Sequence, residues 1–285
     1  MESNVLIVGG DSQIGLAIAS ELKSKNISYW KTTRREEDLG NKTLYLDLDK
    51  NVENWNPPEF ISTVIFCATV KPKEKQNSGL NTLNNSSTIL LAKKFQSQGS
   101  FVIFLSTNSV YDGSVAFTNS TVEVCPRNNY GFDKAVTEKE LIGLGDNISI
   151  LRISKVVTSN MPIFLSWIHS WGEGKPVFPF DDMVMAPISI SFVVILVLTI
   201  MKNKIKGIVQ ASADRDITYS EAAFYLAEQL GIEKSLISPS SYINAGISFS
   251  PAHTTLDSVR LKNDLLIDPP SPFEAIDEFL THIKN

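Results

Sequence analysis

A tyrosine and a lysine four residues apart could together transfer a proton. Tyr130 and Lys134 belong to the segment Tyr-Gly-Phe-Asp-Lys, and a helix here would place both side chains on one face. A free phenol titrates near pH ~10, and a cation within about 4–6 Å favours the phenolate. The pair could therefore act as an acid or a base near neutral pH. Many helices carry such a pair by chance, so the pair alone does not establish catalysis.

A strand end rich in hydroxyl groups precedes this pair. The apolar run 101–105 predicts a buried strand, and the small polar residues Ser106–Ser109 follow it directly. A hydroxyl at the strand end, such as that of Thr107, could hold a carbonyl or alcohol against the phenol while a cofactor transfers a hydride. We therefore interpret Thr107, Tyr130 and Lys134 as the catalytic residues.

The N-terminus has the pattern of a phosphate-binding turn. The apolar run 4–8 predicts a buried strand, Gly9 and Gly10 form a tight turn, and the apolar periodicity of 13–25 predicts a helix. Backbone N–H groups at such a helix start bind phosphate, and the glycines let the backbone approach a pyrophosphate. The residues that we predict to bind the cofactor here are Gly9, Asp11, Ser12, Gln13 and Ile14.

The next strand end suggests which dinucleotide binds. NAD-binding proteins carry an acidic residue after the second strand, whereas Thr33, Arg34 and Arg35 follow the predicted strand 27–31 here. Guanidinium groups match a 2′-phosphate in charge and geometry. We therefore predict that these three residues bind the cofactor and that NADP(H) is favoured over NAD(H). The alternative is a solvated basic loop, balanced by the acidic residues that follow.

Apolar strands alternate with amphipathic helices along most of the chain. The strands are predicted at 4–8, 27–31, 44–46, 63–67, 101–105, 148–153 and 207–210. This alternation predicts an α/β fold, a Rossmann-like doubly wound parallel sheet with a smaller C-terminal substrate-binding lobe. We expect an NAD(P)-binding domain over 1–155, completed by about 188–212. The lobe would comprise 156–187 and 213–285. Arg152 would point outward or lie between domains, and we give it no role.

The motifs together resemble the extended short-chain dehydrogenases/reductases. Within that family they are similar to the dTDP-4-dehydrorhamnose reductase and nucleotide-sugar epimerase branch, through Ser106-Thr107, Tyr111-Asp112-Gly113, Pro126, Tyr130-Gly131 and Lys134. The resemblance implies reduction of a keto group on a nucleotide-linked sugar with NAD(P). It also implies cofactor contacts by Asp47, Leu48, Cys67, Ala68, Thr69, Tyr130 and Lys134, and a substrate contact by Asn108.

Two residues depart from the pattern of that branch. Ser12 occupies the middle glycine position, where it could fit and itself bind a phosphate, and Asn108 replaces the usual Asp. A nucleotide-sugar epimerase or dehydratase is an alternative, although Asn108 cannot serve as the general acid of a dehydratase. A non-catalytic NADP(H)-binding sensor is a further alternative, which the presence of Thr107, Tyr130 and Lys134 weighs against.

Composition narrows the class of protein. The 285 residues are 43% hydrophobic and 20% charged with a net charge of −5, which is ordinary for a globular protein and disfavours nucleic-acid binding. Two separated cysteines and three scattered histidines predict no metal site. The N-terminus lacks a signal-peptide pattern, so we expect a cytoplasmic protein. The uncharged stretch 184–201, interrupted by Pro187, predicts a buried helix rather than a membrane span. A homodimer is possible.

Overall fold

A seven-stranded sheet is the centre of the fold. The computed structural model describes residues 4–68 and 82–284. The strand order is β10-β6-β5-β4-β1-β2-β3; β1 pairs in parallel with β2 and β4, β2 with β3, and β4 with β5. Its strands are β1 (Asn4–Val8), β2 (Ser28–Thr33), β3 (Thr43–Tyr45), β4 (Thr63–Phe66), β5 (Phe101–Thr107), β6 (Ile148–Ile153) and β10 (Gly207–Ala211).

The order of the strands makes this sheet doubly wound. From β1 the chain adds β2 and β3 on one side, and then β4, β5 and β6 on the other. The direction of winding therefore changes between β1 and β4, where sheets of this kind bind ligands at the carboxyl ends of the strands. The predicted Rossmann-like α/β fold is confirmed.

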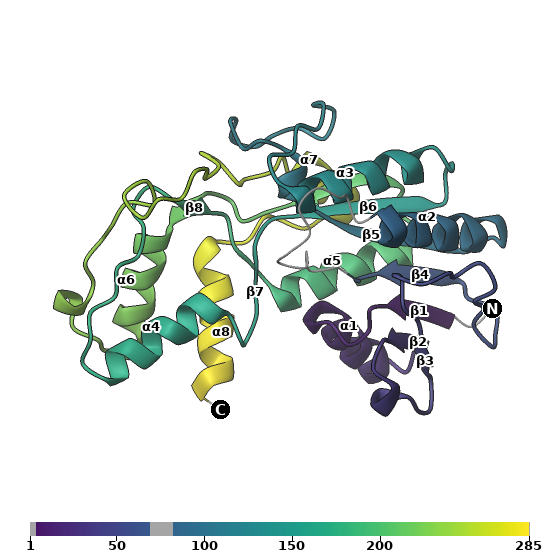
Figure 1. Cartoon of the computed structure of the whole chain (residues 1–285), viewed down its shortest axis with the longest axis horizontal. Coiled ribbons are helices and arrows are strands. Elements are labelled where there is room, and N and C mark those ends of the chain that lie inside the picture. The colour runs from purple at the N-terminus through teal and green to yellow at the C-terminus, as the bar shows by residue number, and fades with distance from the viewer. Residues whose placement is uncertain (1–3, 69–81, 285) are drawn as a thin grey trace. The chain divides into compact units, whose positions relative to one another are not determined.

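Helices bury the faces of this sheet. The helices α2 (Thr82–Ser97) and α3 (Asn129–Ile142) lie over one face of the sheet (Figure 1). The strand residues that share a core cluster with them alternate along the strands, among them Leu6, Val64 and Phe104. The intervening residues, such as Ile65 and Ile103, are also fully buried, because successive side chains of a strand point to opposite faces. The helices α1 (Gln13–Ser24) and α5 (Ile190–Asn203) also carry buried apolar stripes.

The chain divides into two compact units. Unit 1 comprises 1–111, 123–152 and 191–209, and unit 2 comprises 112–122, 153–190 and 210–285. The segment 112–122, which we expected in the cofactor-binding domain, belongs to unit 2. Its backbone explains this, because Phe117 N donates a hydrogen bond to Thr255 Oγ1 at 3.1 Å. The assignment of a cofactor domain and a substrate lobe to these units stays a prediction.

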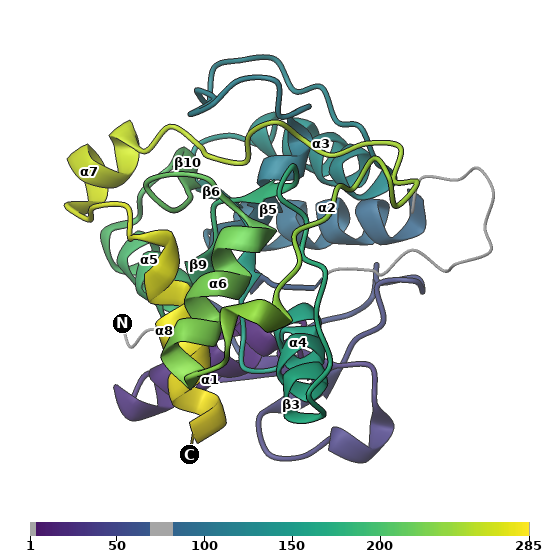
Figure 2. The same ribbon diagram turned by 90° about the vertical axis from the view of Figure 1, so that its left-hand side faces the viewer.

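Unit 2 has its own apolar core. Three helices supply it, α4 (Pro162–Gly172), α6 (Tyr219–Leu230) and α8 (Pro272–Lys284), and Figure 2 shows α6 beside α8. The rings of Phe164 and Phe279 meet edge to face with centroids 5.3 Å apart. Short strand pairs complete the unit: β7 (Val156–Val157) with β9 (Ile188–Ser189), and β8 (Val184–Met185) with β11 (Ile217–Thr218).

Local sequence signals set several helix ends. Thr218 and Glu221 form a capping box at the start of α6, each side chain bonding the other residue's backbone N–H, at 3.0 and 2.6 Å. The uncharged stretch 184–201 forms two short strands and most of α5, and no helix in 4–68 or 82–284 has the length and apolar character of a membrane span. The remaining short helices are η1 (Glu36–Asp38), η2 (Asn108–Val110), η3 (Lys234–Leu236) and α7 (Val259–Leu265).

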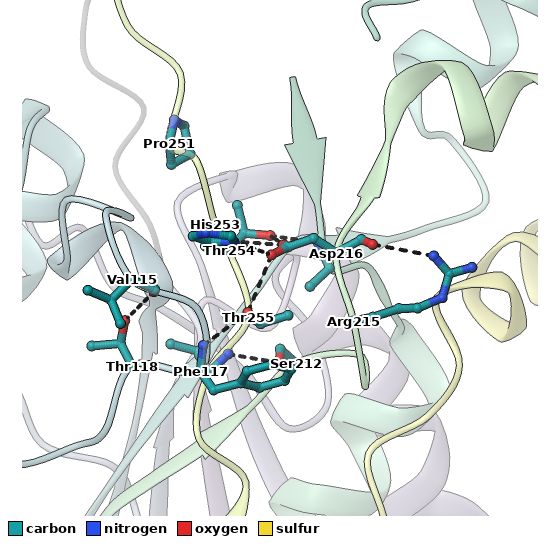
Figure 3. A network of polar contacts seen from close by, with 12 residues as sticks. Val115, Phe117, Thr118, Ser212, Arg215, Asp216, Pro251, His253, Thr254 and Thr255 are labelled. Carbon is teal, nitrogen blue, oxygen red and sulfur yellow. Dashed lines mark hydrogen bonds and ion pairs between the residues drawn. The ribbon is translucent and has the colours of Figure 1, made fainter. Parts of the chain in front are cut away.

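A partly buried carboxylate organises the loops of unit 2 (Figure 3). Asp216 Oδ1 accepts hydrogen bonds from Thr254 N at 2.9 Å and from Thr254 Oγ1 at 2.7 Å. Its Oδ2 accepts from Thr255 Oγ1 at 3.3 Å and lies 3.3 Å from Nδ1 of His253. Since Thr254 Oγ1 also accepts from Ala186 N at 2.7 Å, one carboxylate fixes several chain segments.

Replacing Asp216 by Ala is expected to destabilise the protein by roughly 2–3 kcal/mol, because hydrogen bonds to a charged group would be left without their acceptor. The urea dependence of far-ultraviolet circular dichroism measures this. Asp264→Ala is a matched control, because Asp264 pairs with Arg260 at the surface of α7. We expect that substitution to cost less than about 1 kcal/mol. Equal costs for the two substitutions would contradict the role of Asp216.

Candidate active site

A nucleotide-sized cavity of about 620 Å³ lies at the carboxyl ends of β1 and β2 in unit 1. Its lining includes Gly9 after β1 and Ala68 after β4, the two strands between which the winding changes and where the doubly wound topology predicts a ligand. Most of the residues that we predicted to bind a cofactor line it: Gly9, Asp11, Ser12, Thr33, Arg34, Arg35, Asp47, Leu48 and Ala68.

The turn after β1 requires glycine at its first position. Gly9 has φ of +82°, and a Cβ there would lie only 2.6 Å from the backbone nitrogen of Ala68. Ser12 closes the turn, since its hydroxyl donates to Gly9 O at 2.7 Å and accepts from Gly15 N at 3.1 Å. Ser12 thus caps α1 and fits the middle position of the motif. Its single hydroxyl proton is used within the turn.

Two arginines lie at one end of the cavity, each near a carboxylate. Arg35 Nη2 lies 3.7 Å from Asp11 Oδ2, and its Nε lies 2.7 Å from Asp38 Oδ2. Arg34 Nη1 lies 3.8 Å from Asp49 Oδ2, and both arginine side chains are more than half exposed. Screened surface pairs of this kind are weak, so a phosphate could compete for both guanidinium groups.

Some predicted cofactor residues lie outside the lining of this cavity. The predicted residues that do not line it are Gln13, Ile14, Cys67, Tyr130 and Lys134, and Thr69 falls outside the described residues. Burial raises the pKa of the Cys67 thiol to about 12, although the charge of Lys134 opposes this. Val8, Thr32 and Leu46 do line the cavity, although the sequence did not lead us to predict them. Each of these three residues lies at the end of a predicted strand or directly after it, and this position is the only feature of the sequence that could have indicated a place in the cavity.

Thr107 ends β5 and begins the next turn. All residues of β5 are buried, and the strand continues past its apolar run through Ser106 to Thr107. Thr107 Oγ1 accepts from Ser109 N at 3.1 Å and donates to Asn108 Oδ1 at 3.4 Å. This capping of η2 fixes the hydroxyl at the carboxyl end of the strand, next to the predicted substrate-binding residue Asn108.

A close backbone approach brings the start of α3 to this strand end. A Cβ on Gly131 would lie 2.1 Å from Ser109 O, so no larger residue fits at this position. Asn128 caps the helix by accepting from Gly131 N at 2.8 Å. The neighbouring Tyr130 therefore lies beside η2, the turn that Thr107 caps.

Lys134 is buried behind the tyrosine. Its Nζ donates to Leu105 O at 2.7 Å and lies 4.4 Å from the ring centroid of Phe104 and 5.9 Å from that of Tyr130. Burial lowers the pKa of Lys134 to about 8, against charges on Cys67, Glu138 and Asp133 that raise it. The ammonium group is thus held one turn from the phenol. The arrangement places a buried cation beside the tyrosine, as the spacing of the two residues predicts.

This fold and cavity define the class of the protein, a Rossmann-like doubly wound α/β fold with a cavity at the carboxyl ends of its strands. The family model of the RmlD substrate binding domain matches residues 3–285, and the chain belongs to this family. No curated protein sequence matches the chain significantly.

Solved structures share the fold over almost their full length. The dTDP-4-dehydrorhamnose reductase of Bacillus anthracis in complex with NADP superimposes with a TM-score of 0.84 at 17% identity, covering 100% of both chains. The Bordetella bronchiseptica enzyme WbmG in complex with NAD gives a TM-score of 0.86 at 15% identity, covering 100% of this chain and 94% of the other. A UDP-galactose 4-epimerase gives 0.77 at 16% identity, with 99% and 98% covered.

Proposed function

We propose that the protein is an NAD(P)-dependent oxidoreductase that reduces a keto group on a nucleotide-linked sugar. The observation that carries this proposal is the place of Lys134. Its hydrogen bond to Leu105 O joins the helix of Tyr130 to the strand that ends at Thr107. A phenol, an ammonium group and a hydroxyl gathered in one unit suit proton transfer to a carbonyl oxygen.

Each of the three side chains has a distinct task in this proposal. Tyr130 gives its phenolic proton to the oxygen of the substrate carbonyl as that oxygen becomes an alcohol. Lys134 keeps a positive charge near the phenol, which favours the phenolate left after proton transfer, and would also hold the ribose of a bound nicotinamide. Thr107 donates or accepts a hydrogen bond at the reacting oxygen. A bound nicotinamide would supply the hydride.

We propose NADP(H) as the preferred cofactor. Gly9 permits close approach of a pyrophosphate, and Arg34 and Arg35 line the same cavity at the end of β2. These groups fit a dinucleotide with a 2′-phosphate, and the Bacillus anthracis reductase is solved in complex with NADP. WbmG, solved in complex with NAD, shows that both cofactors occur with this fold.

Arg35→Gln tests this preference. We expect it to weaken NADPH binding roughly tenfold to a hundredfold, because a charge-assisted bond to the 2′-phosphate is lost. NADH binding should change less than about threefold, since NADH lacks that phosphate. Titration calorimetry with each cofactor gives both constants, and Arg260→Gln in α7 is the control. A parallel loss for both cofactors, or tighter NADH than NADPH binding by the unaltered protein, would contradict the proposal.

The direct test of function is oxidation of NADPH with a panel of keto-sugar nucleotides. We expect one molecule of NADPH oxidised for each keto group reduced, followed by ultraviolet absorbance of the reduced nicotinamide and mass spectrometry of the sugar. Firm NADPH binding without oxidation across the panel would instead favour a sensor. The cytoplasmic location and the homodimer stay predictions.

A nucleotide-sugar epimerase is the second candidate. The similarity in fold to a UDP-galactose 4-epimerase favours it, because such a structure accommodates either chemistry. An epimerase would interconvert sugar nucleotides with no net oxidation of added NADPH. Product analysis by NMR in the same assay separates it from a reductase.

A further inference from the structure

A buried ion pair in unit 1 has no task in the proposed mechanism. Arg152 in β6 and Glu138 in α3 are 3% and 2% exposed. The guanidinium group donates through Nε to Oε1 and Oε2 of Glu138, at 3.1 and 3.0 Å, and through Nη2 to Oε2 at 2.6 Å. The expected outward position of Arg152 is therefore wrong, because its side chain is buried against a carboxylate of the same unit. Burying two charges costs desolvation free energy, and hydrophobic residues in place of such a pair often stabilise a protein equally well.

The same guanidinium group reaches the segment that follows β5, the strand that ends at Thr107. Its Nη1 donates to the hydroxyl of Tyr111, and its central carbon lies 5.1 Å from the Tyr111 ring centroid. Tyr111 directly follows η2, the turn capped by Thr107, and its backbone N donates to Asn108 O at 3.0 Å. A displacement of Tyr111 would therefore be transmitted to the turn that holds Thr107 and Asn108.

Glu138 in turn connects this network to the catalytic lysine. It lies one turn after Lys134 on α3, so both side chains occupy the same side of the helix. Its carboxylate raises the pKa of Lys134 and so opposes the effect of burial. The other charged or titratable groups acting on Lys134 are Cys67 at the end of β4 and Asp133 on α3. Tyr130 adds its ring from the preceding turn.

We infer that Arg152, Glu138 and Tyr111 form a positioning network that keeps Lys134 charged and holds the Thr107 turn against α3. The inference rests on the proposed function. None of the three side chains needs to touch substrate or cofactor. Arg152 binds the carboxylate with one side of its guanidinium group and Tyr111 with the other, which sets α3 and the end of β5 in one geometry.

Two variants separate positioning from folding. Tyr111→Phe removes only the hydroxyl, and we expect kcat to fall roughly tenfold with little change in NADPH affinity, because the Thr107 turn loses its anchor. Glu138→Gln/Arg152→Met removes both charges, so no unpaired charge stays buried and the protein should fold. We expect this double variant to lower the pKa of Lys134, because the Glu138 carboxylate that raises it is removed. The alkaline limb of its kcat profile should shift down equally, since uncharged Lys134 no longer assists Tyr130.

The lysine pKa is measured without any sugar or cofactor. Protein labelled with ¹³C at the lysine Cε is titrated by NMR, and the Lys134 signal is the one missing from Lys134→Met. An unaltered pKa and unaltered kcat in the double variant, with the parent protein active, would overturn the inference. So would a lower melting temperature as the sole effect of both variants. A parent protein that oxidises no NADPH would instead reject the proposed function, while the titration still reports the effect of Glu138.

Discussion

Replacing Tyr130 by Phe is expected to reduce kcat by roughly 10²–10⁴-fold, because the substrate oxygen loses its proton donor. The ring is kept, so its contact with Lys134 and the packing of α3 beside η2 should persist. NADPH affinity should therefore change less than about threefold. Steady-state rates with a keto-sugar nucleotide and calorimetric titration of NADPH measure the two effects separately.

The matched control for Tyr130→Phe is Tyr225→Phe. Tyr225 lies on α6, and its hydroxyl donates to Asp277 Oδ1 at 2.8 Å on the surface of unit 2. Loss of that bond should leave kcat unchanged. Full turnover by Tyr130→Phe would remove the phenol from the mechanism, and loss of cofactor binding together with turnover would show that its role is structural.

Local patterns predicted most of the sheet correctly. The strands 4–8 and 148–153 have the expected bounds, because buried parallel strands are continuous apolar runs between polar breaks. The expected end of β5 at Leu105 was too early, since Ser106 and Thr107 are polar yet still part of the buried strand. The short helix α7 was not predicted, because seven residues carry too little periodicity to distinguish a helix from a loop.

Long-range contacts within the site could not be read from the chain. Tyr130 and Lys134 stand out because their spacing is a helical one, but Arg152 contacts Glu138 and Tyr111 at separations of 14 and 41 residues. No local pattern pairs residues at such distances. The close approach of Gly131 to Ser109 likewise depends on how α3 packs against β5. Thr32 lines the cavity beside the turn after β1, where Gly9 N donates to its Oγ1 at 3.0 Å and Gly10 N to its O at 2.9 Å, contacts that apolar runs alone do not determine.

Lys134→Met is expected to stabilise the protein at pH 7 while reducing kcat at least about a hundredfold. Met has a similar length and no charge to bury. The pKa of Lys134 falls from its ordinary value of 10.5 to about 8 in the folded chain, because burial disfavours the charged form. A shift of this size corresponds to a cost of about 3 kcal/mol. The lost hydrogen bond to Leu105 O offsets part of the gain, so we expect about 1–3 kcal/mol.

The stability gained by Lys134→Met should decrease as the pH rises. Below pH 8 Lys134 is charged in both the folded and the unfolded chain, so its burial destabilises the fold in full. Between about pH 8 and pH 10.5 the folded chain has released this proton and the unfolded chain still holds it, so the cost decreases as the pH rises. The advantage of Met in urea unfolding should therefore shrink between pH 7 and pH ~10. Lys139→Met, at an exposed position on the same helix, is the control and should show no such trend. A lower stability of Lys134→Met at pH 7 would mean that the buried ammonium group contributes more to the fold than its burial costs.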